Sequence, residues 1–222
     1  MKKMIAMLAA ALLLFSLAGC GDKKADSTGA NGASNAGQAA SVSCTADDTG
    51  LFEDSTGVVQ LAVGYMENGK NVAVGKAKLP VGGSLVAYGY NAKGENTVLA
   101  NGDTVAAYLE AGADEGAVMS SIYMNTAKAE VYLDVVPNGG KSAVEMLDEV
   151  RAQAFLLTEL NAGIYGAVGS FTAESEGVSV YSVTLPLNDD YSVSIRCMGT
   201  ELYDALGAEE LGSRLCNLFL PA

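Results

Sequence analysis

The chain has 222 residues, with 13 basic and 26 acidic side chains and a formal net charge of −13. An acidic surface repels the phosphate backbone of nucleic acids, so nucleic acid is not an expected partner. The sequence contains no histidine. This excludes Ser-His-Asp and Cys-His catalytic groups and every metal site that uses a histidine ligand.

The first 19 residues have the pattern of an export signal. Lys2 and Lys3 give a basic start, and residues 4–15 are all apolar. A run of about 12 apolar residues is too short to cross roughly 30 Å of hydrocarbon as a stable helix. We therefore predict a signal peptide over residues 1–19 and not a transmembrane helix.

The tetrapeptide Leu17-Ala18-Gly19-Cys20 closes this segment and resembles the lipobox of bacterial lipoproteins. The resemblance implies cleavage after Gly19, a thioether-linked diacylglyceryl group on Cys20 and acylation of the new amine. Two or three acyl chains, such as palmitate, anchor a protein durably. The expected location is the membrane surface facing away from the cytoplasm, with inner or outer membrane left open. The alternative is an ordinary secretory signal in which Cys20 is incidental.

Residues 20–50 are rich in Gly, Ala, Ser, Asn and Asp, with almost no large apolar side chains. Such a segment cannot bury enough apolar surface to fold by itself. We predict a lipidated, disordered tether with a root-mean-square span of roughly 30 Å. Residues 51–222 are long enough for a single domain with its own core.

Short runs of apolar and β-branched residues predict most of the strands. Residues 58–65 and 71–78 flank an Asn-Gly turn and predict a hairpin. Further strands are predicted at 85–90, 97–100, 121–124 and 129–136. Residues 178–185 and 191–198 alternate with period two and predict a closing hairpin.

Three helices are predicted between and after these strands. The first runs to about Ala111 with Asp103 as its N-cap. The second opens with a capping box at Ser142 and Glu145, and its apolar stripe continues to Leu160. The third follows the closing hairpin, with an inner stripe of Leu211, Leu215 and Leu218.

Strands joined mostly as hairpins, with two or three helices between them, predict an α+β fold in which helices cover a mainly antiparallel sheet. The closing order of helix, β-hairpin and C-terminal helix, over residues 142–219, loosely resembles the PsbP-like α/β/α sandwiches of small exported lipoproteins. This resemblance rests on element order alone. It implies a binding or assembly role and carries no site residues.

Beyond Cys20, three cysteines remain, Cys44, Cys197 and Cys216. Oxidising conditions outside the cytoplasm favour disulfides. We predict the pair Cys197–Cys216, because one lies on the apolar face of a strand and the other near the end of the next helix. Closing that loop would contribute about 3 kcal/mol in the chain-entropy model. Three reduced, buried thiols are the alternative, and no metal site is expected.

Tyrosine is the one residue type that indicates a binding surface. The chain has 10 tyrosines, 5 phenylalanines and no tryptophan, and Tyr88 and Tyr90 lie two apart on one strand. A tyrosine ring gives a rigid apolar body with a polar tip, which suits a binding surface that must stay soluble. The alternative is that these rings lie at the edge of the core.

Other motifs have structural explanations. Gly140-Lys141-Ser142 precedes a helix, as in a phosphate-binding loop, but the glycine required five positions earlier is Val135. Asp189-Asp190 lacks the ligand spacing of a calcium loop and is predicted to be a hairpin turn. No cofactor and no catalytic residue is predicted.

The expected function is a non-enzymatic binding or assembly role at the cell envelope, with a protein or envelope component as partner. One alternative is a surface hydrolase that brings two carboxylates together in a cleft. The other is a small-molecule capture protein with an enclosed pocket. The sequence leaves the oligomeric state open.

Overall fold

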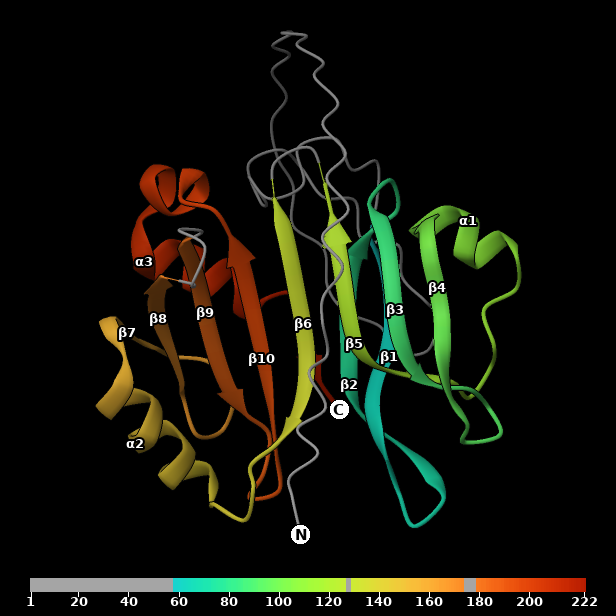
Figure 1. Cartoon of the computed structure of the whole chain (residues 1–222), viewed down its shortest axis with the longest axis horizontal. Coiled ribbons are helices and arrows are strands. Elements are labelled where there is room, and N and C mark those ends of the chain that lie inside the picture. The colour runs from blue at the N-terminus through green and yellow to red at the C-terminus, as the bar shows by residue number, and fades with distance from the viewer. Residues whose placement is uncertain (1–57, 127–128, 174–178) are drawn as a thin grey trace, which may run out of the picture. The chain divides into compact units, whose positions relative to one another are not determined.

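The computed structural model describes residues 58–126, 129–173 and 179–222, which form eleven strands and three helices (Figure 1). The strands are bonded into one sheet, and each recorded strand pairing except that of β1 with β5 is antiparallel. The predicted α+β fold is confirmed. The predicted signal peptide and tether, with Cys20 and Cys44, lie outside the described residues.

Strands β1 (Val58–Glu67) and β2 (Lys70–Pro80) form the predicted first hairpin. The turn residues Asn68 and Gly69 have φ angles of 50° and 74°. A type I′ turn needs positive φ at both central positions, which Asn and Gly tolerate best. The position of this hairpin, predicted from the Asn-Gly pair, is therefore confirmed.

Strands β3 (Ser84–Tyr90) and β4 (Asn96–Thr104) form a second hairpin, followed by the short helix α1 (Val105–Glu110). The prediction that Asp103 caps α1 is wrong by one residue. The Thr104 hydroxyl accepts the Ala107 N–H at 3.1 Å instead. Pairing between β3 and β4 continues through Thr104, so the helix begins only after it.

Strands β5 (Val118–Asn125) and β6 (Glu130–Pro137) are both predicted, and β5 is the branch point of the sheet. It pairs with β3 along its whole length. It also pairs with β6 from Ser121 onward and, in parallel, with β1 at Met119. The sheet therefore continues from β5 in two directions, toward β6 and toward β1.

Helix α2 (Ala143–Gln153) begins as predicted, with a complete capping box between Ser142 and Glu145. Its predicted extension to Leu160 is wrong. Residues Phe155–Leu160 form strand β7, which pairs with the unpredicted strand β8 (Ala167–Ala173). Pairing with β8 satisfies the backbone that a longer helix would have bonded internally.

Strands β9 (Ser179–Pro186) and β10 (Tyr191–Met198) form the predicted closing hairpin. Helix α3 (Glu201–Cys216) follows and is kinked at Gly207, whose φ of 77° is not helical. After it, the short strand β11 (Phe219–Pro221) pairs with β2, which the sequence did not predict.

One buried cluster extends from the first hairpin to α3 and forms the core. Leu211 and Leu215 of α3 are 1% and 0% exposed, so the predicted inner stripe is confirmed for these two residues. Leu218 is also buried but lies beyond the helix. The core-facing side chains of β10 alternate as predicted and comprise Val193, Ile195 and Cys197.

Candidate functional site

One face of the sheet carries tyrosines on several neighbouring strands, and we call it the tyrosine face. Residues that lie opposite each other in antiparallel strands point to the same side. The register therefore forms two rows across β3, β5, β6 and β10, which lie side by side in Figure 1. One row is Tyr88, Ser121 and Asp134, and the other is Val86, Tyr123, Tyr132 and Arg196.

The predicted binding strand, β3, forms one side of this face. Tyr88 is 49% exposed and lies between Val98 of β4 and Ser121 of β5. Tyr90 follows two residues later, half-buried at the end of β3. Because side chains alternate along a strand, both rings belong to the same side of β3.

Arg196 is held in place on β10, where it ends one of the two rows of the tyrosine face. Its Nη2 atom lies 2.9 Å from Oδ2 of Asp134, and its guanidinium carbon lies 5.0 Å from the centre of the Tyr132 ring. The hydroxyl of Ser121 donates to the other Asp134 oxygen. The Arg196 side chain keeps 37% of its surface exposed, so it is positioned but still accessible.

Tyr123 and Tyr132 form the apolar part of the same face. Their ring centroids are 4.8 Å apart, and the rings are tilted by 45°. Burial, followed by the nearby carboxylate of Glu130, raises the pKa of Tyr123. Its hydroxyl is therefore harder to ionise than that of a solvent-exposed tyrosine.

Helix α2 borders this face further along the sheet. The strand register continues both rows. Ser170 is joined through β9 to Arg196, and Thr184 is joined through β10 to Asp134. Val150 and Gln153 of α2 lie with Ser170 and Thr184 around a hollow of about 420 Å³. The tyrosine face is therefore an open sheet surface that is bordered by α2 at one end.

A second group of exposed apolar side chains lies on β7 and the turn that follows it, and Phe155 of this group also lines the hollow beside α2. Phe155, Leu156 and Ile164 are 71%, 53% and 89% exposed, and Tyr165 is 39% exposed. Strand β7 is the last strand on its side of the sheet. Tyr165, in the turn between β7 and β8, provides a matched control position for Tyr88.

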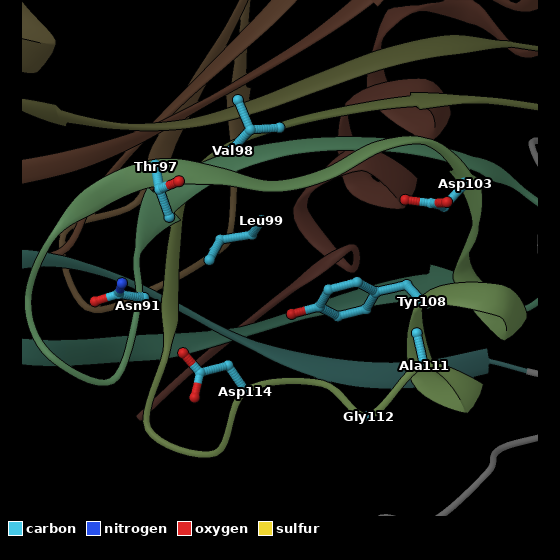
Figure 2. Close-up of a pocket in the computed structure, with 9 residues that line it drawn as sticks. All are labelled: Asn91, Thr97, Val98, Leu99, Asp103, Tyr108, Ala111, Gly112 and Asp114. Carbon is cyan, nitrogen blue, oxygen red and sulfur yellow. The ribbon is translucent and has the colours of Figure 1, made fainter.

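A separate pocket of about 320 Å³ lies between α1, the end of β3 and strand β4 (Figure 2). Its lining includes Asn91, Val98, Leu99, Asp103, Tyr108 and Asp114. Figure 2 shows the Tyr108 hydroxyl pointing toward the end where Asn91 and Asp114 lie, with Asp103 near the opposite end of the ring. Val98 lies opposite Tyr88 in the strand register, and Figure 2 shows its side chain directed away from Leu99 and Tyr108.

Hydrogen bonds fix both carboxylates of this pocket. Oδ2 of Asp114 accepts the Ala92 N–H at 2.9 Å, and Oδ2 of Asp103 accepts the Asn101 N–H at 3.1 Å. Burial, followed by the charge of Asp114, raises the pKa of Tyr108. The pocket therefore combines two carboxyl groups that each accept a backbone N–H with a phenol whose pKa is raised.

Cys197 and Cys216 are both buried and both free thiols in the structure, so the predicted disulfide is not formed here. Each is near Tyr181. Cys197 lies opposite it in the β9–β10 register, and the charge of Cys216 contributes to its pKa. Burial raises the pKa of each thiol to about 11. Both sulfurs therefore stay protonated and weakly nucleophilic at neutral pH.

Lys141 and Ser142 of the apparent phosphate-binding motif, and Asp189 of the predicted hairpin turn, all have structural partners. Ser142 caps α2, and Lys141 forms an ion pair with Glu149. Asp189, in the turn between β9 and β10, accepts the Ala143 N–H at 3.0 Å. These contacts explain the three residues as parts of a helix start.

Sequence reasoning located Tyr88 and Tyr90 but missed Arg196, Asp134 and the pocket. Among the described residues, no group of three or more acidic or cysteine side chains is arranged to hold a metal ion. Nor does the described part of the chain contain a helix long and apolar enough to span a membrane. Comparison with protein families, curated proteins and solved structures finds no match.

Proposed function

We propose that the chain is an exported lipoprotein, anchored through Cys20, whose tyrosine face binds a protein partner at the cell envelope. The observation that carries the binding role is the pair of side-chain rows from Tyr88 to Arg196. The anchor rests on the sequence alone, on the basic start, the apolar run and the lipobox at Leu17–Cys20.

The composition of the tyrosine face supports recognition of a protein. Tyrosine and arginine are enriched where protein partners meet, because each offers a large contact area and a directed hydrogen bond. Tyr88 is exposed, whereas Arg196 and Asp134 are held by their ion pair and by Ser121. A partner would therefore meet side chains that lose little conformational entropy on binding.

The arrangement of charge supports binding over catalysis. The carboxylate of Asp134 is already neutralised by Arg196, and it accepts a hydrogen bond from Ser121. A general acid or base needs a proton-transfer group that is free to reach its substrate. Both oxygens of Asp134 are engaged, one by Arg196 and one by Ser121, so its role in this geometry is to orient Arg196.

Site-specific photocrosslinking in cells that express the full chain tests the binding role. A benzophenone amino acid at position 88 is expected to give a discrete protein adduct, and the same group at Tyr165 is not. Tyr123→Ser should reduce the adduct formed from position 88, because it removes a neighbouring part of the face. Equal adducts at positions 88 and 165, or no effect of Tyr123→Ser, would contradict the proposal.

The anchor needs its own test. The intact mass of membrane-extracted protein should correspond to a chain that begins at Cys20 and carries a diacylglyceryl group or more. The variant Cys20→Ala should lose both the added mass and the membrane fraction. Unlipidated wild-type protein would rule out the lipoprotein, and it would leave the crosslinking test of the face unaffected.

A further inference from the structure

The pocket between α1 and β4 has charged ends and an apolar middle. Asp103 and Asp114 lie toward opposite ends of the Tyr108 ring, and Leu99 lies on the side of the Tyr108 hydroxyl (Figure 2). Its volume of about 320 Å³ is at the lower end of the range for small-molecule sites, roughly 300–1,000 Å³. The pocket is therefore large enough for a short, extended molecule.

Each carboxylate has bonding capacity left for a ligand. The hydrogen bonds recorded for the described residues use Oδ2 of Asp114 and Oδ2 of Asp103, both with backbone donors. An ionised carboxylate accepts on both oxygens, so Oδ1 of each can take a further donor. The backbone bonds also hold each side chain still, which lowers the entropy lost on binding.

The charge around the pocket favours a cation. No lysine or arginine is among the residues that line it. Between positions 91 and 117 the chain has one basic residue, Lys93, and the acidic residues Glu95, Asp103, Glu110, Asp114 and Glu115. Such a local excess of negative charge attracts cations and repels anionic ligands.

We propose that this pocket binds a small organic dication, in which two ammonium groups are separated by a short hydrocarbon chain. One ammonium group pairs with Asp114, beside the Tyr108 hydroxyl, and the other pairs with Asp103. The methylene groups lie against Leu99 and the Tyr108 ring. An aromatic ring also attracts a nearby cation through its negative face.

This site is independent of the protein partner proposed for the tyrosine face. The inference extends the function to capture of a diffusible amine by an anchored protein. Inorganic divalent cations lack the hydrocarbon that the middle of the pocket would bury, so they should bind weakly here. A neutral diol of the same length lacks the charges and should also bind weakly.

Isothermal titration calorimetry of the full chain with putrescine tests the proposal. Putrescine should bind, whereas 1,4-butanediol should not, and magnesium chloride at the same ionic strength should not displace putrescine. Asp114→Asn and Asp103→Asn should each raise Kd by about tenfold or more, which is the loss expected for a hydrogen bond to a charged group. Each asparagine keeps a side-chain oxygen, which can still accept the backbone N–H that bonds to the aspartate in the wild type.

Glu209→Gln is the matched control, because it removes one negative charge from an exposed position on α3, far along the chain from the pocket. It should leave Kd within about twofold of wild type, as expected for a distant exposed charge screened by salt. Unchanged unfolding temperatures would show that each variant is folded. The proposal is overturned if the wild type does not bind putrescine, or if Glu209→Gln weakens binding as much as Asp103→Asn and Asp114→Asn do.

Discussion

The rings of Tyr65 and Tyr191 are stacked, with centroids 3.6 Å apart and planes inclined by only 14°. Tyr65 belongs to β1 and Tyr191 begins β10, and these two strands are not neighbours in the sheet. The stack therefore joins the β1–β2 hairpin to the closing hairpin without a backbone hydrogen bond. Burial, followed by the charge of Glu67, raises the pKa of Tyr65, so the stacked phenol is neutral at physiological pH.

A double-mutant cycle of Tyr65→Ala and Tyr191→Ala should show coupling between these two rings. Aromatic pairs contribute about 0.5–1.5 kcal/mol beyond the area that they bury, and we expect a coupling energy in that range. Urea unfolding of the wild type, both single variants and the double variant measures it. Additive losses would mean that the rings pack independently.

The local signals of turns and helix starts explain which elements were predicted. Asn68-Gly69 and the Ser142–Glu145 capping box each act within a few residues, so the sequence located both correctly. Strand β7 was missed because Leu157 and Leu160 also fit the spacing of a helix. Its strand conformation depends on pairing with β8, which local spacing does not report.

The candidate sites depend on contacts between distant parts of the chain. Arg196 meets Asp134 across 62 positions because β10 pairs with β6, and the register of that pair was not readable from the sequence. In the pocket, Asp114 accepts the N–H of Ala92 in the turn after β3. This contact depends on the path of the loop that follows α1. Tyr88 was predictable because its own strand pattern exposes it.

Gly212→Ala should destabilise the fold by about 1–3 kcal/mol, the usual cost of adding a methyl group to a packed core. A Cβ at Gly212 would lie 2.7 Å from Cδ1 of Leu160 and 2.8 Å from the Tyr181 hydroxyl. That hydroxyl donates to the Ala208 carbonyl at 2.7 Å, so it cannot move without breaking the bond. Thermal or urea unfolding measures the loss.

Ala205→Gly is a suitable comparison for Gly212→Ala, because Ala205 is exposed on the same helix. It should cost about 1 kcal/mol through helix propensity alone. If Gly212→Ala were as stable as the wild type, α3 would have to lie farther from Leu160 of β7 and Tyr181 of β9 than the structure places it.

Cys197 and Cys216 should resist alkylation in the native protein and react only after unfolding. Both thiols are buried, and burial raises the pKa of each to about 11, so little thiolate is present at neutral pH. Peptide mapping after treatment with iodoacetamide, with and without urea, follows each cysteine separately. A peptide that links Cys197 to Cys216 in a non-reduced digest would show that the protein forms the disulfide absent from the structure.

The free energy of unfolding should fall as the pH rises from about 9 to about 12. Burial raises the pKa of Cys197 and Cys216 from 9.0 to about 11, and it raises that of Tyr181 from 10.0 to about 12. The pKa values of Tyr65, Tyr108 and Tyr123 are shifted in the same direction. The unfolded chain therefore releases these protons at lower pH than the folded chain does.

Between each pair of pKa values the folded state holds more protons, so stability declines with pH by linkage. The contribution of the two cysteines is complete below pH 9 and is lost by about pH 11, whereas that of Tyr181 is lost between about 10 and 12. The double variant Cys197→Ala, Cys216→Ala should lose less unfolding free energy than the wild type between about pH 9 and 11. Tyr181→Phe should lose less between about pH 10 and 12. The readout is the slope of unfolding free energy against pH, which is separate from the fixed cost of each substitution. Parallel curves for all variants would mean that the buried thiols and the phenol ionise alike in the folded and unfolded chains.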